Sequence, residues 1–366
     1  MSKNDLLYYL ALQKADGVGA INAKKLLTHC GDVQTIFEEK ASKLSKISGI
    51  GSYVVKSLKD KTLFDQAEKE LAYIDKNNIS YQLITDKNYP DKLKHCADAP
   101  IVLFLKGHIN LKDQKIISIV GTRNITNYGK EVLDALIESL VIYKPIIISG
   151  LAYGVDIYAH KLAVKHQLQT VAVLAHGLDK IYPSIHGKVA SQMQGNGGLI
   201  TEFWSGSNPE KENFVKRNRI IAGLSEATIV IESAAKGGSL ITADLANSYN
   251  RDVFAVPGKL SDTYSKGCNN LIKTNRASLY TSVADLAYLL NWDKEISVKP
   301  IQKQLFVELE KDEKPIYSFL NEKGKQQLDQ IALHCKLPIH KTVTVLFNLE
   351  MKGFVKPLPG KLYQAI

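Results

Sequence analysis

Hydrophobic residues between positions 115 and 260 follow two alternating patterns. Short runs of consecutive valine, isoleucine and leucine are typical of strands buried on both faces, and apolar residues recurring every three or four positions are typical of helices. The predicted strands lie at 115–120, 145–149, 170–175, 199–202, 228–232 and 252–256, and the predicted helices at 128–142, 155–166, 213–224 and 239–250. This alternation favours an α/β fold, a Rossmann-like, doubly wound and mostly parallel sheet, with ligands bound beyond the carboxyl ends of the strands.

The first 80 residues predict short helices and two similar turns. Gly17-Val18-Gly19 and Gly49-Ile50-Gly51 each precede a helical segment. This pattern is the signature of a helix-hairpin-helix, whose helix N-termini can hold a phosphate. The alternative is a bundle like the sterile α-motif (SAM) that only packs against its neighbour. We assign residues 1–80 to this helical domain and residues 81–293 to an extended Rossmann-like domain.

The C-terminal region carries a different pattern. Residues 294–303 are polar, contain Pro300 and are typical of a linker. Residues 304–366 hold three helical segments, at 313–321, 327–334 and 339–352, followed by two short segments around a Pro-Gly turn. Three helices followed by a β-hairpin predict a winged helix. Several domains are expected in any case, because 366 residues exceed what one core normally holds.

Composition limits the classes of function. A net charge of +10 and a pI near 9.1 favour polyanionic partners such as nucleic acid or an anionic membrane surface. The four cysteines are far apart, so neither a zinc site nor a disulfide scaffold is expected, and free thiols fit a reducing, cytoplasmic location. No stretch approaches the length of a membrane span. We expect no metal and no cofactor.

Arginine is scarce, and its positions narrow the search for a binding site. Lysine and arginine together number 47, but only five are arginines: Arg123, Arg217, Arg219, Arg251 and Arg276. In a chain so rich in lysine, we expect arginine where a planar, forked guanidinium must grip phosphate or carboxylate. The alternative is that each arginine holds a structural ion pair.

Three of the predicted strands end in loops that suit an anion. Their glycines, hydroxyls and cations are Gly121, Thr122, Arg123, Ser149, Gly150, Lys236, Gly237, Gly238 and Ser239. Backbone N–H groups and cations in such loops can follow a chain of phosphates. An ordinary mononucleotide pocket is the alternative, although neither the dinucleotide fingerprint nor the P-loop pattern occurs.

The start of the helix near residue 213 places an aromatic ring among cations. The residues concerned are Lys211, Phe214, Arg217, Asn218 and Arg219. In single-strand binding, a base stacks on the aromatic ring while cations hold the flanking phosphates. Phe214 can equally be a core residue of that helix. No nucleophile–base pairing is readable in the chain, and we expect no catalytic residue.

Several long motifs, occurring in order, resemble those of the DNA-processing protein A family (DprA, also called Smf). They lie at 119–123 (IVGTR), 149–160, 214–224 (FVKRNRIIAGL), 237–243 (GGSLITA), 256–258 and 267–272. The helix-hairpin-helix-like and winged-helix regions also match the family's longer architecture, so the resemblance covers nearly the whole chain.

This resemblance implies a non-enzymatic protein that binds single-stranded DNA. Members of the family protect incoming DNA in natural transformation, load the recombinase RecA onto it, and form homodimers through the Rossmann-like domain. Their DNA-contacting positions match Arg123, Lys211, Phe214 and the surroundings of Arg217-Asn218-Arg219. This chain departs from the usual pattern at Thr122, where serine is usual, and at His176 and His186, which concern the fine geometry of loops.

Two other functions compete with this one. The first is a nucleotide-processing Rossmann-like enzyme of the phosphoribohydrolase type, but the look-alike segment Pro257-Gly258-Lys259-Leu260 lacks the catalytic loop pattern. The second is a regulator that reads duplex DNA with its winged helix. The third helix of that domain has no arginine or glutamine, so it is poorly suited to base readout.

Overall fold

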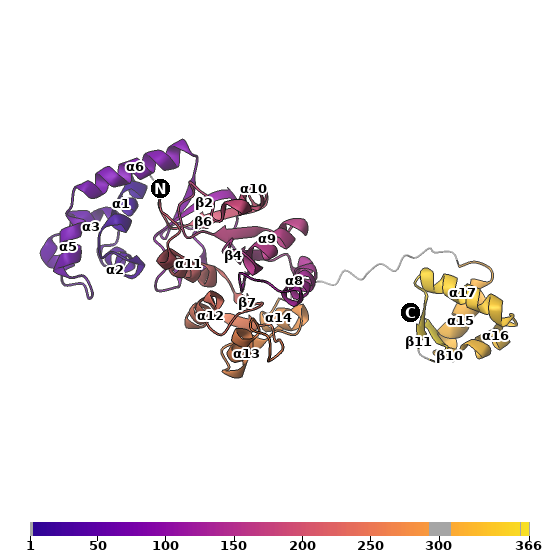
Figure 1. Ribbon diagram of the computed structural model, residues 1–366. Helices are drawn as coiled ribbons and strands as arrows, with labels where there is room; N and C mark the ends of the chain where they lie inside the picture. Colours follow the sequence, from indigo (N-terminus) through magenta and orange to yellow (C-terminus); the bar gives the residue numbers. More distant parts are fainter. Residues whose placement is uncertain (1–2, 293–308, 359, 366) are drawn as a thin grey trace. The chain divides into compact units, whose positions relative to one another are not determined.

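The computed structural model describes residues 3–292, 309–358 and 360–365. It divides into two compact units, Met1–Glu295 and Ile296–Ile366 (Figure 1). The linker expected at 294–303 lies outside the described residues.

A nine-stranded sheet in the order β1-β2-β6-β5-β4-β3-β7-β8-β9 organises the first unit. The pairs from β6 to β9 are parallel, while β1 and β2 add an antiparallel edge next to β6. The mostly parallel α/β fold expected from the sequence is therefore confirmed, and the edge strands β1, β2 and β9 were not among the predicted elements. The strands are β1 (Ser80–Leu83), β2 (Val102–His108), β3 (Ile116–Val120), β4 (Ile146–Ser149), β5 (Thr170–Val173), β6 (Gly197–Thr201), β7 (Ala227–Val230), β8 (Asp252–Ala255) and β9 (Ser278–Leu279).

The direction in which the chain adds strands reverses beside β3. Ile117 of β3 pairs with Ile147 of β4 on one side and with Ala227 of β7 on the other. The strands β4, β5 and β6 extend the sheet one way, and β7, β8 and β9 extend it the other way. The loops after β3 and β7 therefore diverge from one topological switch point, where open α/β sheets leave room for a ligand.

The central strands are mostly apolar and fully buried because each face of the sheet is covered by helices. Ile117 and Ile119 of β3 enter one core, and Ile116 and Val120 enter the other, since successive side chains alternate between faces. The first core contains residues of α8 (Asn127–Leu140), α9 (Val155–Lys165) and α14 (Val283–Leu289). The second contains residues of α10 (Gly187–Met193), α11 (Lys211–Leu224), α12 (Gly238–Ser248) and α13 (Lys266–Lys273).

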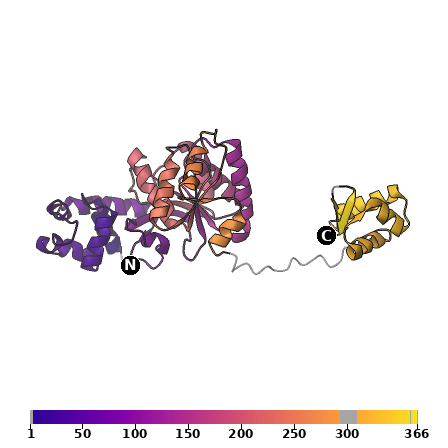
Figure 2. The ribbon, with the colours of Figure 1, turned by 90° about the horizontal axis from the view of Figure 1, so that it is seen from below.

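The N-terminal helices share the second core, and Figure 2 shows them continuing from one side of the sheet. Glu70 is buried and accepts hydrogen bonds from the backbone N–H and the hydroxyl of Ser205. Gly17 and Gly49 have φ values of +76° and +90°, a conformation that L side chains rarely adopt, just before α2 and α5. The helices are α1 (Lys3–Lys14), α2 (Ala20–Cys30), α3 (Val33–Glu38), α4 (Ala41–Leu44), α5 (Ser52–Leu58) and α6 (Thr62–Lys76).

The second unit has a core made of its own residues. Ile316, Leu320, Ile331, Leu346 and Leu349 belong to this core and are almost fully buried. Three helices and a three-stranded sheet surround it, as expected for a winged helix. They are α15 (Glu313–Lys323), β10 (Gln326–Gln327), α16 (Leu328–Cys335), α17 (Ile339–Met351), β11 (Val355–Leu358) and β12 (Leu362–Ala365).

Candidate nucleic-acid interface

A cavity of about 360 Å³ lies at the carboxyl ends of β3 and β7, at the switch point of the sheet. The loop after β3 supplies Gly121, Thr122 and Arg123 to its lining. The loop into α12 and the first turn of that helix supply Ser233, Ala234, Gly237, Gly238 and Ser239. The start of α11 supplies Lys211, Phe214, Arg217 and Asn218. Three segments that were singled out separately in the sequence therefore meet around one hollow.

Phe214 forms part of the wall of this cavity and is half-buried. The guanidinium carbon of Arg123 lies 5.7 Å from the centroid of the Phe214 ring, and that of Arg217 lies 5.8 Å from it. Arg123 itself is exposed. The ring is thus held beside two cations and leaves part of its surface open, an arrangement suited to stacking an aromatic ligand beside an anion.

Arg217 lies beneath the cavity and is only 4% exposed. Its Nη1 donates hydrogen bonds to the carbonyl oxygens of Gly150 and Val173, and its Nε donates to Asn218. Burial lowers the pKa of the guanidinium to about 10, so Arg217 stays protonated at neutral pH. The Nη1 group therefore ties the ends of β4 and β5 together, and little of the Arg217 side chain faces solvent.

Asp156 at the start of α9 is the charge partner of Arg217. The carboxylate accepts hydrogen bonds from the backbone N–H groups of Gly150 and Ala152 at 3.1 and 3.4 Å. Burial raises the pKa of Asp156, and the guanidinium of Arg217 opposes this shift. Gly150 is required in this arrangement, because a Cβ atom on it would lie 2.2 Å from Nη1 of Arg217. Asp156 and Arg217 together fix the shape of the loop after β4.

Four of the expected site residues are not among those that line the cavity: Ser149, Gly150, Arg219 and Lys236. Arg219 forms an ion pair with Glu202 and donates to the carbonyl of Asp98, on a different side of α11 from Arg217. Ser149 is fully buried and its hydroxyl donates to the carbonyl of Ile119 at 2.6 Å. Neither lines the hollow. Lys236 is exposed in the loop that follows β7, just outside the lining residues.

His160 also has a packing role. It is fully buried, and its Nδ1 lies 2.7 Å from the hydroxyl oxygen of Thr170. Burial lowers the pKa of its imidazole to about 3, so the ring is neutral at physiological pH. A neutral, buried imidazole outside the cavity is poorly placed to act as a base.

Tyr182 was missed as a site residue from the sequence. Its side chain is 47% exposed, and its ring centroid lies 6.0 Å from that of Phe214. Tyr182 lies in the loop that follows β5. Its position after a predicted strand was a clue in the sequence, since such a loop lies at the same edge of the sheet as the glycine-rich loops. The contact between the two rings was not predictable, because Tyr182 and Phe214 are far apart along the chain.

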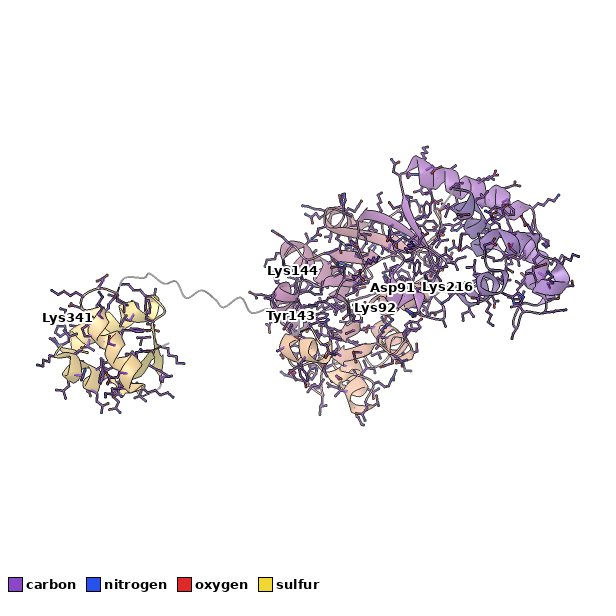
Figure 3. All side chains as sticks on the ribbon, turned by 180° about the vertical axis from the view of Figure 1, so that it is seen from behind. Asp91, Lys92, Tyr143, Lys144, Lys216 and Lys341 are labelled. Carbon is purple, nitrogen blue, oxygen red and sulfur yellow. The ribbon has the colours of Figure 1, made fainter. Side chains whose placement is uncertain are left out.

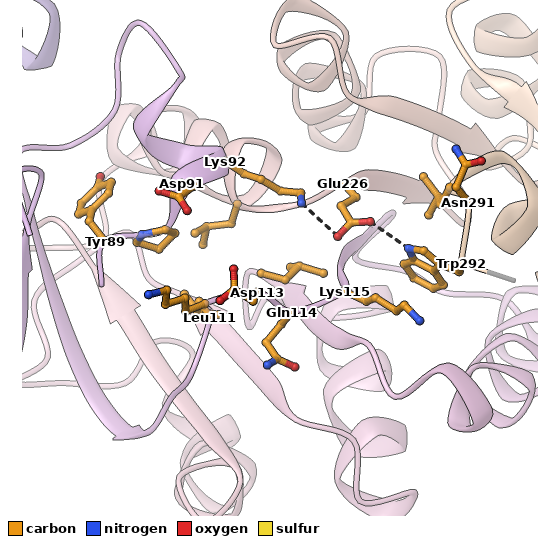
Figure 4. Close-up of a pocket in the computed structure, with 15 residues that line it drawn as sticks. Tyr89, Asp91, Lys92, Leu111, Asp113, Gln114, Lys115, Glu226, Asn291 and Trp292 are labelled. Carbon is orange, nitrogen blue, oxygen red and sulfur yellow. Dashed lines mark hydrogen bonds and ion pairs between the residues drawn. The ribbon is translucent and has the colours of Figure 1, made fainter. Parts of the chain in front are cut away.

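A second cavity, of about 350 Å³, lies at the opposite end of β3 (Figure 4). It is lined by three lysines and three carboxylates, and Glu226 already binds Nζ of Lys92 at 3.2 Å and Nε1 of Trp292 at 2.9 Å. The cavity at the carboxyl ends instead holds three cations and a single carboxylate, Asp156, among its described lining residues. The two hollows are similar in size, so charge rather than volume identifies the anion site.

Within the described residues, no group of histidine, cysteine and acidic side chains is placed to hold a metal ion. The four cysteines are free thiols. None of the described helices has the length and apolar character needed to cross a bilayer.

Comparison with known proteins gives consistent matches. A family model described as DNA recombination-mediator protein A matches residues 80–291, and a model described as DprA winged helix domain matches residues 303–361. Protein Smf of Synechocystis sp. is 30% identical over all of both chains. The DNA processing protein DprA of Bacillus subtilis is 39% identical over 60% of this chain and 74% of its own length.

Two solved structures of DNA processing protein A resemble this one. The X-ray structure of the Streptococcus pneumoniae protein is 30% identical, with a TM-score of 0.65, and the match covers 79% of this chain and 98% of that one. A Helicobacter pylori structure, described as giving insight into a single-stranded DNA binding mode, is also 30% identical, with a TM-score of 0.53 over 59% of this chain and 96% of that one. A recombination mediator acts by binding DNA and not as an enzyme, in agreement with the expectation from the sequence. On the match of residues 80–291 and the full-length likeness to protein Smf, this chain belongs to the DprA/Smf family of DNA recombination mediators.

Proposed function

We propose that this chain is a cytoplasmic protein that binds single-stranded DNA in the cavity at the carboxyl ends of β3 and β7. The single observation that carries the proposal is the exposed guanidinium of Arg123 beside the half-buried ring of Phe214, at the mouth of a hollow lined by glycine-rich loops. The single-stranded DNA binding described for the Helicobacter pylori protein supports it.

The residues take different roles in this proposal. Arg123 and Lys211, both exposed, hold phosphates, together with backbone N–H groups of the glycine-rich loops. Phe214 stacks one base, and Tyr182 extends the aromatic surface. Arg217 supports the loop after β4 from below. Duplex DNA keeps its bases stacked inside the helix, so an aromatic ring within a cavity selects the single strand.

The rival enzymatic function finds less support in the cavity. Asp156, the single carboxylate among its described lining residues, is buried, faces Arg217 and accepts two backbone hydrogen bonds. A general acid or base needs a free lone pair or proton directed at the substrate. Asp156 cannot act as a general acid or base without losing the hydrogen bonds that hold the loop after β4.

We expect tighter binding to poly-dT than to a duplex of equal length, with affinity falling steeply as salt rises, because DNA binding releases counterions. In Arg123→Ala the affinity falls for all sequences, and the slope of log K against log salt becomes shallower by about 0.7, the value for one phosphate contact on a single strand. Filter binding or fluorescence anisotropy across salt concentrations measures both.

Lys216 supplies a matched control for Arg123. It is an exposed cation on α11, labelled in Figure 3, and is not among the residues that line the cavity. Lys216→Ala removes the same charge and should change the salt slope less than Arg123→Ala does. Equal affinity for duplex and single strand, or identical slopes for the two variants, would contradict the proposed site.

We further propose that the bound strand is protected and then handed to RecA, as in natural transformation and homologous recombination. The family's description as a recombination mediator supports this role. It is tested by following RecA filament assembly on single-stranded DNA already coated with single-strand-binding protein. The wild-type chain should shorten the lag before assembly, and Arg123→Ala should not.

The proposal includes a homodimer formed by the Rossmann-like domain. In the described sheet β9 is an edge strand, and exposed apolar side chains gather there and on α14: Leu279 (47% exposed), Tyr288 (76%) and Leu289 (51%). An edge strand with apolar neighbours is suited to pairing with a second copy. Because the N-terminal helices share a core with the sheet, the fragment to test is residues 1–295.

Sedimentation equilibrium of residues 1–295 should give a dimer at tens of micromolar, and Leu279→Lys should give a monomer with an unchanged circular dichroism spectrum. A monomeric wild-type fragment at that concentration would mean that another part of the chain carries the assembly.

A further inference from the structure

The third helix of the winged-helix unit, α17, exposes an apolar stripe that nothing in the described part of its unit covers. Ile339, Val343, Phe347 and Met351 are 54%, 42%, 57% and 74% exposed. They recur every four residues, so they lie along one side of the helix, over a length of about 18 Å. A stripe of four large apolar side chains in water indicates an interaction surface.

The lysines on this helix and directly after it are already engaged within the unit. Lys341, labelled in Figure 3, forms an ion pair with Asp312 at 2.9 Å. Lys352, which follows the helix, binds Glu313 at 2.7 Å and Glu310 at 3.4 Å. A helix that reads DNA in the major groove presents unpaired cations and amides to the bases and phosphates. This helix presents hydrocarbon instead, so its partner is a protein surface of the same apolar kind.

We propose that α17 docks antiparallel against α17 of a second copy of this chain. With the two-fold axis at position 345, a residue six positions before the axis meets the residue six positions after it. Ile339 then contacts Met351 of the second copy, and Val343 contacts Phe347, so all four members of the stripe are buried. The two-fold axis makes each of these contacts occur twice, once from each copy. The stripe is therefore complementary to itself, as a two-fold interface requires.

Charge complementarity selects this partner and this register. His340 and Glu350 lie within the arc of the helix covered by the stripe, five positions on either side of 345, and both are exposed. Neither forms an ion pair with a described residue. In the antiparallel pair, the imidazole of His340 faces the carboxylate of Glu350 from the second copy, and the contact occurs twice. Each copy of the helix therefore contributes an apolar stripe at the centre of the interface, and a His340 and a Glu350 that pair with those of the other copy.

A hollow beside the stripe accommodates the longest side chain. Leu333, Leu337 and Ile339 line a depression between α16 and α17, and Leu333 is 82% exposed. Met351 of the second copy lies opposite Ile339 in the proposed pairing and can enter this depression. Methionine is unbranched and fills irregular apolar gaps well.

The test uses residues 296–366, which form a compact unit with a core of their own. Sedimentation equilibrium at roughly 100 µM, a concentration suited to a small interface, should give a dimer. Phe347→Lys should raise the dissociation constant by about tenfold or more, as for loss of a central apolar anchor. The matched control is Asn348→Lys, which adds the same charge at the next exposed position and should leave the dimer intact.

A charge exchange tests the register. His340→Glu places two carboxylates opposite each other and should weaken the dimer, whereas the double variant His340→Glu with Glu350→Lys should restore it. Circular dichroism confirms that each variant folds, which is expected because every changed side chain is exposed. A monomeric wild-type fragment overturns the proposal, whether or not the fragment binds residues 1–295 or duplex DNA. A dimer unaffected by Phe347→Lys overturns it as well.

Discussion

Arg217→Ala should destabilise the first unit by about 3–5 kcal/mol, the usual cost of removing one partner of a buried ion pair. The substitution leaves Asp156 buried without its guanidinium and removes the hydrogen bonds that Nη1 donates to the carbonyls of Gly150 and Val173. Urea or thermal unfolding of residues 1–295 measures the loss. A second variant, Arg217→Ala with Asp156→Asn, removes both charges and should recover part of the stability.

The matched control for this variant is Arg123→Ala. Arg123 is exposed, so its replacement should change the unfolding free energy by less than about 0.5 kcal/mol while weakening DNA binding. The two arginines line the same cavity, but Arg217 is buried and hydrogen-bonded to two carbonyls whereas Arg123 is exposed. An Arg217→Ala protein that is as stable as wild type but fails to bind single-stranded DNA would show that the guanidinium contacts the ligand directly.

Phe214→Ala should lower the affinity for single-stranded DNA by about 1–3 kcal/mol, the typical contribution of one stacked base. The slope of affinity against salt should stay nearly unchanged, because a ring contact releases no counterion. Phe214→Trp should retain most of the affinity, since it keeps an aromatic face beside Arg123 and Tyr182. Anisotropy titrations at several salt concentrations distinguish a ring contact from a phosphate contact.

Phe214 is half-buried, so the Phe214→Ala experiment also tests whether the ring belongs to the core. If Phe214→Ala unfolds the unit while the folded fraction binds DNA as tightly as wild type, the ring is a core residue. In that case Tyr182, which is 47% exposed, is the remaining aromatic candidate for stacking beside the cavity.

The five arginines show what the sequence alone can predict about a side chain and what depends on the tertiary structure. Their scarcity predicted positions where a guanidinium grips phosphate or carboxylate, with a structural ion pair as the alternative. The structure shows intramolecular partners for four of the five, and the phosphate-binding role of Arg123 stays a prediction. Four of them bind carbonyls or carboxylates of this chain: Arg217, Arg219, Arg251 and Arg276. Arg123 is exposed, and its contact within the described residues is with the ring of Phe214. No local pattern distinguishes these cases, because the partners lie tens of residues away.

Arg217 and Arg219 of α11 also show that the tertiary structure decides the role of an arginine. Arg217 and Arg219 are two positions apart, so on an α-helix they point about 200° away from each other. Arg217 is directed under the loop after β4, and Arg219 is directed towards Glu202 and Asp98. The sequence shows only that both are near Phe214, and the direction of the helix relative to the sheet decides which of them borders the cavity.

The sequence by itself determined the layered α/β core, because largely apolar strands such as Ile116–Val120 have to be covered on both faces. It also determined that glycine-rich loops follow the strands. Only the tertiary structure decided that the loops after β3 and β7 border one cavity, since β7 pairs beside β3 although about a hundred residues separate them. It also decided that Tyr182 joins Phe214 and that the apolar stripe of α17 stays exposed. Strand order and helix orientation arise from packing between distant segments, and no local pattern of residues encodes them.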